Sequence, residues 1–166
     1  MVLRGVSRWA RFCLAAVAMI LLVVPAGAQS NNDQIAKVLS LMKSCGYNYQ
    51  TSSMPTVWTI HSTGKHLKDI KVVVAIGPDV DSELIIFVTV TEKRRMPVTT
   101  DFMRYLLQQN DALDQVKVGY DRDGDLFVRI DGTLRLADAE YFRHIVTQLQ
   151  ESSDIIYGQI EPQLLP

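Results

Sequence analysis

The stretch Gly119-Tyr120-Asp121-Arg122-Asp123-Gly124-Asp125-Leu126-Phe127-Val128 can be a calcium-binding loop or a hairpin turn, and the choice decides the fold. Asp121, Asp123 and Asp125 match the first, third and fifth positions of an EF-hand loop, but that loop also needs Gly at its sixth position and Glu at its twelfth. This chain has Leu126 and Gly132 there. Alternating apolar residues on both sides predict instead two strands joined by a Gly-containing turn. The three carboxylates remain a weak candidate for a loosely held calcium ion, and we expect no resident metal.

The N-terminal residues have the pattern of a secretory signal peptide. Three arginines precede an apolar run over residues 13–24, and this run is shorter than the ~20 residues that cross a bilayer. Small residues before Gln29 fit a cleavage site between Ala28 and Gln29. We therefore expect residues 1–28 to be a signal peptide and residues 29–166 to form a single domain. This domain would be periplasmic or secreted, with no stable membrane anchor after signal removal.

Composition limits the partners of that domain. The whole chain has a formal net charge of −1, and loss of the three N-terminal arginines leaves a mildly acidic domain, which argues against binding to nucleic acid. Cys45 is the only cysteine after residue 28, so we expect no internal disulfide. It lies on the apolar side of a predicted helix, where a buried inert thiol is expected rather than a nucleophile or an intermolecular bridge.

Hydrophobic periodicity and capping residues predict an α+β domain. Helices are expected from Asn31 or Asn32 to Gly46, from Thr99 or Thr100 to about Asn110, and after Asp138. Strands are expected at 57–61, 70–76, 84–91, 116–120 and from 126 to about 136. The order is α-β-β-β-α-β-β-α, with about five strands in one antiparallel sheet and the helices segregated from it.

Several segments carry a resemblance to a known family. The segments are Leu41-Met42-Lys43-Ser44-Cys45-Gly46-Tyr47, Leu106-Leu107-Gln108-Gln109-Asn110, Val116-Lys117-Val118-Gly119-Tyr120 and Asp123-Gly124-Asp125-Leu126. Together they resemble the YbjN family, which is related to the type III secretion chaperone-like fold. The resemblance implies a compact α+β domain that binds another polypeptide or itself, with no catalytic residues to carry over. The export signal departs from the cytoplasmic secretion chaperones and argues against a role in escorting effectors.

Catalytic and cofactor motifs are not found in the sequence. Of the three histidines, His61 and His66 form only a loose pair, and solvated histidines are the expected alternative to a metal site. Phosphate-binding loops and nucleophile elbows are also missing, so we expect neither an enzyme nor a cofactor. The run Lys93-Arg94-Arg95 could bind an anionic head group or an acidic protein, or it could be a solvated turn that discourages edge pairing.

The strands give the clearest functional indication, because two of them are apolar on both faces. Beside the expected core residues, the second face would carry Val73, Ala75, Ile85 and Phe87, joined by Phe127. This face could be an exposed interface, or it could be covered within the monomer by a helix or by the polar segment 48–55. Trp58 is either a buried anchor or an interface aromatic.

Two functions therefore remain open. The first is an exported, non-enzymatic protein-binding domain, chaperone-like or regulatory, which holds a partner polypeptide or forms a homodimer through this face or an edge strand. The alternative is a small-ligand or ion-binding sensor domain in the envelope. Its site would be the turn that carries the three aspartates or a pocket between sheet and helices.

Overall fold

The computed structural model describes residues 26–77, 83–97 and 99–166 of the chain, with side chains from residue 31 onward. Residues 34–166 form one compact unit. The proposed signal peptide lies mostly outside the described residues. Its expected cleavage site, Ala28 and Gln29, falls within helix α2 (Ala26–Ser44), which begins earlier than the predicted asparagine caps.

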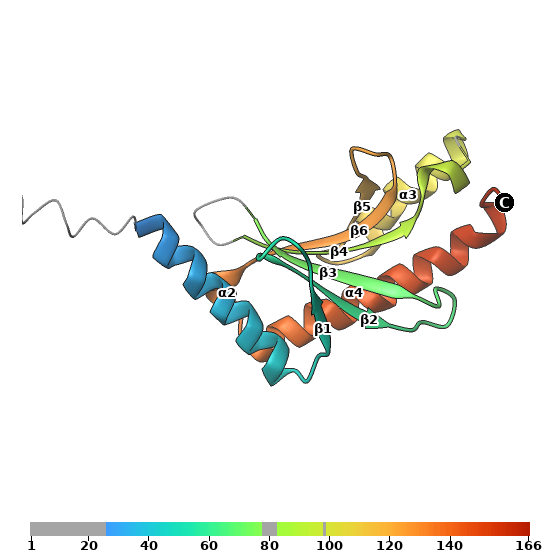
Figure 1. Cartoon of the computed structure of the whole chain (residues 1–166). Helices are drawn as coiled ribbons and strands as arrows, with labels where there is room; N and C mark the ends of the chain where they lie inside the picture. Colours follow the sequence, from blue (N-terminus) through green and yellow to red (C-terminus); the bar gives the residue numbers. More distant parts are fainter. Residues whose placement is uncertain (1–25, 78–82, 98) are drawn as a thin grey trace, which may run out of the picture. The chain divides into compact units, whose positions relative to one another are not determined.

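The centre of the unit is an antiparallel sheet (Figure 1). Its strands are β1 (Tyr49–Thr51), β2 (Val57–Ser62), β3 (Ile70–Ile76), β4 (Glu83–Thr91), β5 (Lys117–Tyr120) and β6 (Leu126–Thr133). They are arranged in the order β1-β2-β3-β4-β6-β5. The α+β class and the antiparallel sheet are confirmed, but the sheet has six strands rather than about five. Sequence periodicity missed β1 because all three of its residues are exposed, so it shows no apolar alternation.

Capping residues mark the end of α2 and the starts of α3 and α4, as the sequence indicated. Gly46, with a φ of 74°, ends α2, because glycine adopts this left-handed conformation without steric cost. Thr99 caps α3 (Thr100–Ala112) by accepting a hydrogen bond from the backbone N–H of Phe102. Asp138 caps α4 (Ala139–Ile160) through the backbone N–H of Tyr141 at 2.8 Å. Three short 3₁₀ helices, η1 (Lys93–Arg95), η2 (Leu134–Leu136) and η3 (Glu161–Gln163), complete the described elements.

One hydrophobic core lies between one face of the sheet and the helices. Helix α4 contacts β3, β4 and β6, and it runs along the sheet in Figure 1. The strand residues that face α4 are 0–9% exposed; they include Ile70, Val72, Val74, Ile76, Leu84, Ile86, Val88, Val90, Val128 and Ile130. Each fully buried aliphatic side chain contributes about 1.5–3 kcal/mol, so this face holds the domain together.

The other helices pack beside α4 and not on the far side of the sheet. The half-buried Cys45 at the end of α2 donates its Sγ–H to the carbonyl of Ala139, and the Tyr47 ring meets Phe142 edge to face at 6.2 Å. At the other end of α4, the hydroxyl of Tyr105 on α3 donates to the side chain of Gln159. The helices thus share one layer, which is the segregation expected from the sequence.

The connection between β2 and β3 is fixed to α4 by one carboxylate. Asp154 accepts hydrogen bonds from the backbone N–H groups of Lys65, His66 and Leu67 at 3.0, 2.7 and 2.7 Å. Burial alone raises the pKa of Asp154, but the three backbone hydrogen bonds outweigh it and hold the pKa below the ordinary value. Gly158 lets the connection lie close, because a Cβ there would be 2.6 Å from the His66 ring.

Within the described ranges, none of the helices has the length and apolar character needed to cross a membrane.

Candidate functional site

The face of the sheet opposite the helices carries a row of apolar side chains, which we call the apolar strip. Its members are Val57 on β2, Val73 and Ala75 on β3, and Ile85 and Phe87 on β4. All five are half-buried, whereas their neighbours on the core face are 0–9% exposed. The strip includes four of the predicted protein-binding residues. Their position on one face is confirmed, and their role in binding stays a prediction.

Strand pairing makes this strip continuous across three strands. Val57 lies opposite Ala75, which in turn lies opposite Ile85. In the next row, Val73 pairs with Phe87. Directly opposed side chains on one face are in contact distance, so the apolar strip is a single surface and not a set of isolated residues.

The polar segment 48–55 does not cover this face. Its residues Tyr49–Thr51 form β1, which pairs with β2 at the edge of the sheet. Met54 and Ser52 close a local turn through hydrogen bonds between themselves. The sequence left open whether this segment lies over the second face, and its edge position answers that question.

On the side of β6 and β5 the apolar strip ends at charged residues, which we call the charged border. It consists of Glu83, Lys117, Arg129 and Asp131. Arg129 pairs with both Asp131 and, at 3.5 Å, Glu83, and Lys117 lies 2.7 Å from Asp131. Burial raises the pKa of Asp131, but the hydrogen bonds from Lys117 and Arg129 outweigh it, so the pKa is below the ordinary value. The border is thus a balanced ionic network beside an apolar surface.

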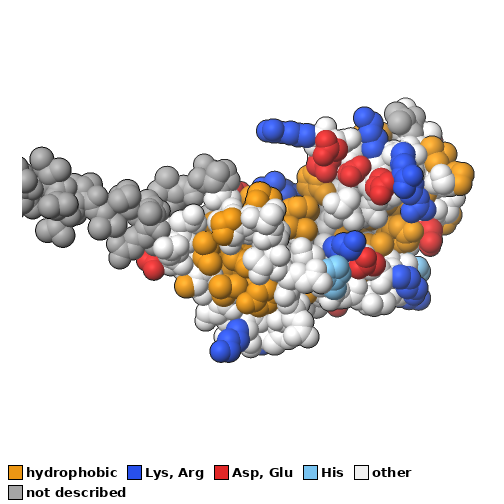
Figure 2. Space-filling model, viewed as in Figure 1, with side chains coloured by type: hydrophobic (Ala, Val, Ile, Leu, Met, Phe, Trp, Pro, Cys, Tyr) orange, Lys and Arg blue, Asp and Glu red, His pale blue; other side chains and the backbone are white. Residues whose placement is uncertain are grey.

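Figure 2 shows one face of the molecule with its side chains coloured by type. Hydrophobic side chains gather in one region, and side chains of both charges gather around the β5 to β6 end of the sheet.

Phe127 lies on the same face but serves a local purpose. It is opposite Thr89 on one side and Gly119 on the other. Its ring packs over Gly119, where a Cβ would be 3.2 Å from the Phe127 Cζ atom. The half-buried ring therefore shields a glycine in a strand. It lies in the row next to the one that contains Phe87 and Arg129, diagonal to Phe87, so it borders the end of the apolar strip.

Trp58 belongs to the core and not to this face. It is 1% exposed and pairs with Val74, a core residue. Since neighbouring residues of a strand point to opposite faces, Trp58 points away from Val57 and the apolar strip. Its inclusion among the protein-binding candidates is corrected by this burial, and the alternative of a buried anchor is the one that holds.

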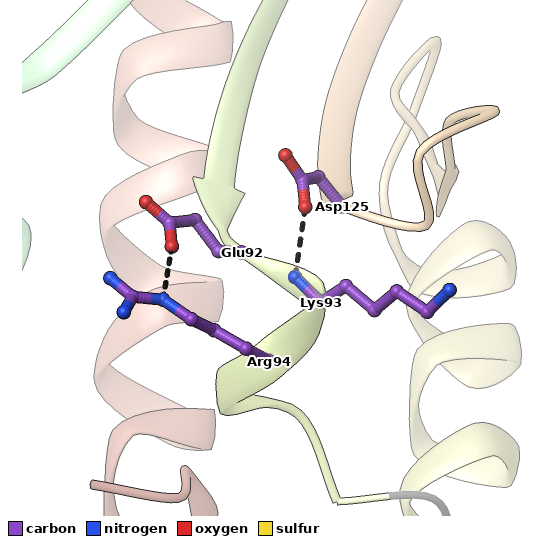
Figure 3. Close-up of a pocket in the computed structure, with 4 residues that line it drawn as sticks. All are labelled: Glu92, Lys93, Arg94 and Asp125. Carbon is purple, nitrogen blue, oxygen red and sulfur yellow. Dashed lines mark hydrogen bonds and ion pairs between the residues drawn. The ribbon is translucent and has the colours of Figure 1, made fainter.

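The cationic run Lys93-Arg94-Arg95 does not act as one cluster. These residues form η1, in which successive side chains point in directions about 120° apart. Figure 3 shows Lys93 and Arg94 pointing apart across a surface hollow that Glu92 and Asp125 also line. Arg94 pairs with Glu92 at 2.5 Å, and the backbone N–H of Lys93 donates to Asp125 at 2.8 Å (Figure 3).

The turn that opens the sequence analysis is a hairpin connection, as predicted. Asp121 Oδ1 accepts hydrogen bonds from the backbone N–H groups of Asp123 and Asp125, and Gly124 has a φ of 89°. Asp125 in turn accepts from the backbone N–H of Lys93. In the part of the chain that the structure describes, no group of three or more His, Cys, Asp or Glu side chains could hold a metal ion. The carboxylates of Asp121 and Asp125 are thus occupied by backbone N–H groups.

The histidines are likewise separated. His61 lies 3.3 Å from Asp69, which also pairs with Lys71 at 3.3 Å, while His66 lies against Gly158 of α4. The hydrogen bond from His61 is the main cause that lowers the pKa of Asp69; it outweighs burial, which raises the pKa, and Lys71 lowers it further. His61, Asp69 and Lys71 form a small cluster at the surface. Neither this cluster nor the surroundings of His66 place a nucleophile beside a base.

Comparison with solved structures identifies the fold. The chain is similar to YbjN, a putative transcription regulator from E. coli, with a TM-score of 0.57 and 14% identity over 80% of this chain and 95% of that one. It is also similar to a chain of the ExsC-ExsE complex (TM-score 0.55, 11% identity, 75% and 90% covered). A third match is to a chain of the heterodimeric complex ExoU-SpcU from the type III secretion system of Pseudomonas aeruginosa. Its TM-score is 0.52 and its identity is 16%, over 76% of this chain and 97% of that one.

Neither protein-family models nor curated protein sequences give a match. At 11–16% identity the likeness shows the fold alone. The chain has a YbjN-like, type III secretion chaperone-like fold, as the resemblance in its sequence indicated.

Proposed function

We propose that this protein is a non-enzymatic protein-binding domain and that the apolar strip is its contact surface. The observation that carries the proposal is the continuous, half-buried row from Val57 to Phe87 on the side of the sheet away from the helices. Contiguous apolar surface of this kind, rimmed by polar residues, marks interaction sites. The solved complexes with this fold contain partner polypeptides, which supports a polypeptide rather than a small molecule as the ligand.

The apolar strip can supply the free energy for such an interaction. A Phe, Ile or Val side chain of the strip leaves at most about a third of its surface exposed, so it gains roughly 0.5–1 kcal/mol when a partner completes its burial. Five adjacent side chains give a favourable term of several kcal/mol, and part of it is offset by the cost of association. The partner is a segment of another chain or a second copy of this one.

We also propose that the protein acts outside the cytoplasm. The support is the N-terminal sequence, in which three arginines precede an apolar run and small residues precede Gln29. Fractionation of cells that make the full chain, followed by N-terminal sequencing, tests this part. Recovery from the periplasm or medium with an N-terminus at Gln29 agrees with it. An uncleaved cytoplasmic protein contradicts it.

The binding role is tested by substitution within the apolar strip. We expect the double variant Ile85→Asp, Phe87→Asp to keep its circular dichroism spectrum and to lose both self-association in sedimentation equilibrium and any protein that co-purifies with the tagged wild type. The matched control is Leu136→Asp, because Leu136 is 72% exposed on η2 and lies outside the sheet. An unfolded double variant would show that the two residues are core. A folded variant with unchanged association and capture also contradicts the proposal.

A further inference from the structure

A pocket opens at one end of the apolar strip, where β3 begins and β4 ends. Its volume is about 580 Å³, and Val73 of the apolar strip forms part of its wall. Leu67 and Val90 add further apolar surface, and η1 closes the end through its arginines. A chain that lies on the strip therefore reaches this pocket without leaving the surface; we call it the end pocket.

The end pocket has more positive than negative charge. Lys71, Arg94 and Arg95 line it, against the carboxylates Asp69 and Glu92. Both carboxylates are already paired, Asp69 with Lys71 at 3.3 Å and Glu92 with Arg94 at 2.5 Å. Since Lys71 and Arg94 are the partners in these pairs, Arg95 accounts for the one excess positive charge of the pocket.

Most N–H donors of the Arg95 guanidinium have no hydrogen-bond partner among the described residues. It carries five N–H donors in a planar fork. Among the described residues, its one recorded side-chain hydrogen bond runs from Nε to the carbonyl of Leu165, at the long distance of 3.5 Å. A planar acceptor with a single negative charge is the natural complement of such a fork.

Thr91 adds a second unsatisfied group in the same wall. It is 6% exposed, and its hydroxyl has no hydrogen-bond partner within the described parts of the chain. It follows a bulge in β4 between Thr89 and Thr91, where the pairing with β6 shifts. A buried hydroxyl without a partner costs about 1–3 kcal/mol, and it adds polar character to the wall of the pocket beneath its surface.

We propose that the end pocket receives a carboxylate side chain, so that the segment bound by the apolar strip is an acidic polypeptide with apolar residues next to Glu or Asp. This inference rests on the proposed protein-binding function. One carboxylate matches the surplus of one charge, whereas a doubly charged phosphate would face repulsion from Asp69 and Glu92. The apolar strip beside the pocket selects the neighbouring side chain.

Fluorescence anisotropy with synthetic peptides of defined charge tests the proposal. The probe is a labelled peptide of about eight residues that alternates Leu with Glu, long enough to cross the sheet. Of two comparison peptides, one alternates Leu with Lys and the other alternates Ser with Glu. We expect the wild type to bind the Leu/Glu peptide about tenfold or more tighter than either comparison peptide, because charge-assisted pairs and apolar burial both contribute. Added salt should weaken the binding.

The chain offers a matched pair of variants for the end pocket. Arg94→Gln combined with Arg95→Gln should weaken binding of the Leu/Glu peptide about fivefold or more. Lys93→Gln removes a charge from the same η1 helix but from a side chain that points away from Arg94 (Figure 3), and should leave the affinity within about twofold. Lys71→Gln, on a side chain that is 61% exposed, is a second pocket variant that should also weaken binding and that leaves η1 intact.

The outcomes separate this inference from the proposed function. Equal binding of the Leu/Glu and Leu/Lys peptides, both lost in Ile85→Asp, Phe87→Asp, overturns the carboxylate pocket and leaves the apolar strip as a binding surface. Equal losses in Lys93→Gln and the double arginine variant overturn it too. Binding to vesicles of phosphatidylcholine and phosphatidylglycerol (3:1), with no binding of the Leu/Glu peptide, identifies a lipid surface and contradicts the inference. If no peptide binds and the apolar-strip variant still captures partners, both proposals fail.

Discussion

Two faces of the same strands carry the same kind of side chain and differ in what covers them. Val74 and Ile86 are paired on the core face and are 0% exposed beneath the helices. Val73 and Phe87 are paired one residue away on the opposite face and are only half-buried. A sheet with helices on one side needs only one apolar face to fold. Folding therefore does not require the second apolar face, and this face is the candidate for a functional surface.

The largest expected effect is a loss of stability when a side chain of the core face is truncated, compared with the same truncation on the opposite face. Ile86→Ala should lower the free energy of unfolding by about 2–5 kcal/mol, because it leaves a cavity in the core. Ile85→Ala, one residue earlier, should lower it by about 1 kcal/mol or less, since that side chain is already partly in contact with water. Urea denaturation of both variants measures the difference. Equal losses would mean that the second face is core and would remove the basis of the comparison.

The next effect concerns the carboxylate of Asp154, which holds the β2–β3 connection through three backbone N–H groups; we call this contact the clamp. Asp154→Asn should cost about 1–2 kcal/mol, because charge-assisted hydrogen bonds to three backbone N–H groups become weaker or are lost. Urea denaturation at neutral pH, where the clamp is fully ionised, gives this difference directly. The matched control is Glu151→Gln, an exposed residue of the same helix.

The pH dependence of that clamp has a definite sign. The pKa of Asp154 in the folded protein lies below the ordinary value of 3.8. Its stabilising contribution is therefore present above the unfolded pKa and is lost as the pH falls through the lower, folded pKa. The difference between wild type and Asp154→Asn should shrink between neutral pH and about pH 3. A difference that grows on acidification would contradict the assignment.

A smaller effect is expected at the charged border of the open face. Asp131→Asn should lower the free energy of unfolding by about 0.5–1 kcal/mol, because it weakens the pairs with Lys117 and Arg129, which lie near the surface. Denaturation in low and high salt checks the cause, since screening should reduce the difference. A loss above that range would place these charges among the groups that maintain the fold.

No effect is expected from calcium at the β5–β6 turn. Asp121 and Asp125 already accept backbone hydrogen bonds, which leaves them poorly placed to converge on an ion. Millimolar calcium should leave the melting temperature unchanged in a thermal scan, with EDTA as the reference. An increase that disappears in Asp121→Asn would revive the alternative of an ion-binding sensor.

Much of this fold could be predicted from sequence because capping residues and alternation act locally. Gly46, Thr99 and Asp138 mark helix ends through their own backbone contacts. The alternation in β3 and β4 also identified the two faces correctly. Strand β1 was missed because all of its residues are exposed, so it has no apolar pattern, and only its pairing with the neighbouring strand β2 defines it.

The site was predicted less completely, for a related reason. Sequence adjacency suggested that Lys93, Arg94 and Arg95 act together, whereas Lys93 points away from Arg94 and only the two arginines of this run line the end pocket. The end pocket takes Lys71 and Arg95 from different segments of the chain, which come to line one pocket only after β3 and β4 pair. For Trp58, the parity of its position relative to Val57 was the available signal, since alternation along β2 puts the two residues on opposite faces.

Site-specific photocrosslinking tests whether the apolar strip is the surface that binds a partner. A photoreactive phenylalanine analogue is placed at position 87 in the apolar strip, and at position 155 as a control on α4, where Ile155 is 51% exposed. After irradiation of intact cells, we expect position 87 to form adducts with a discrete polypeptide or with a second copy of this chain, and position 155 to form none. Adducts at position 155 with none at position 87 would contradict the assignment of the apolar strip as the binding surface.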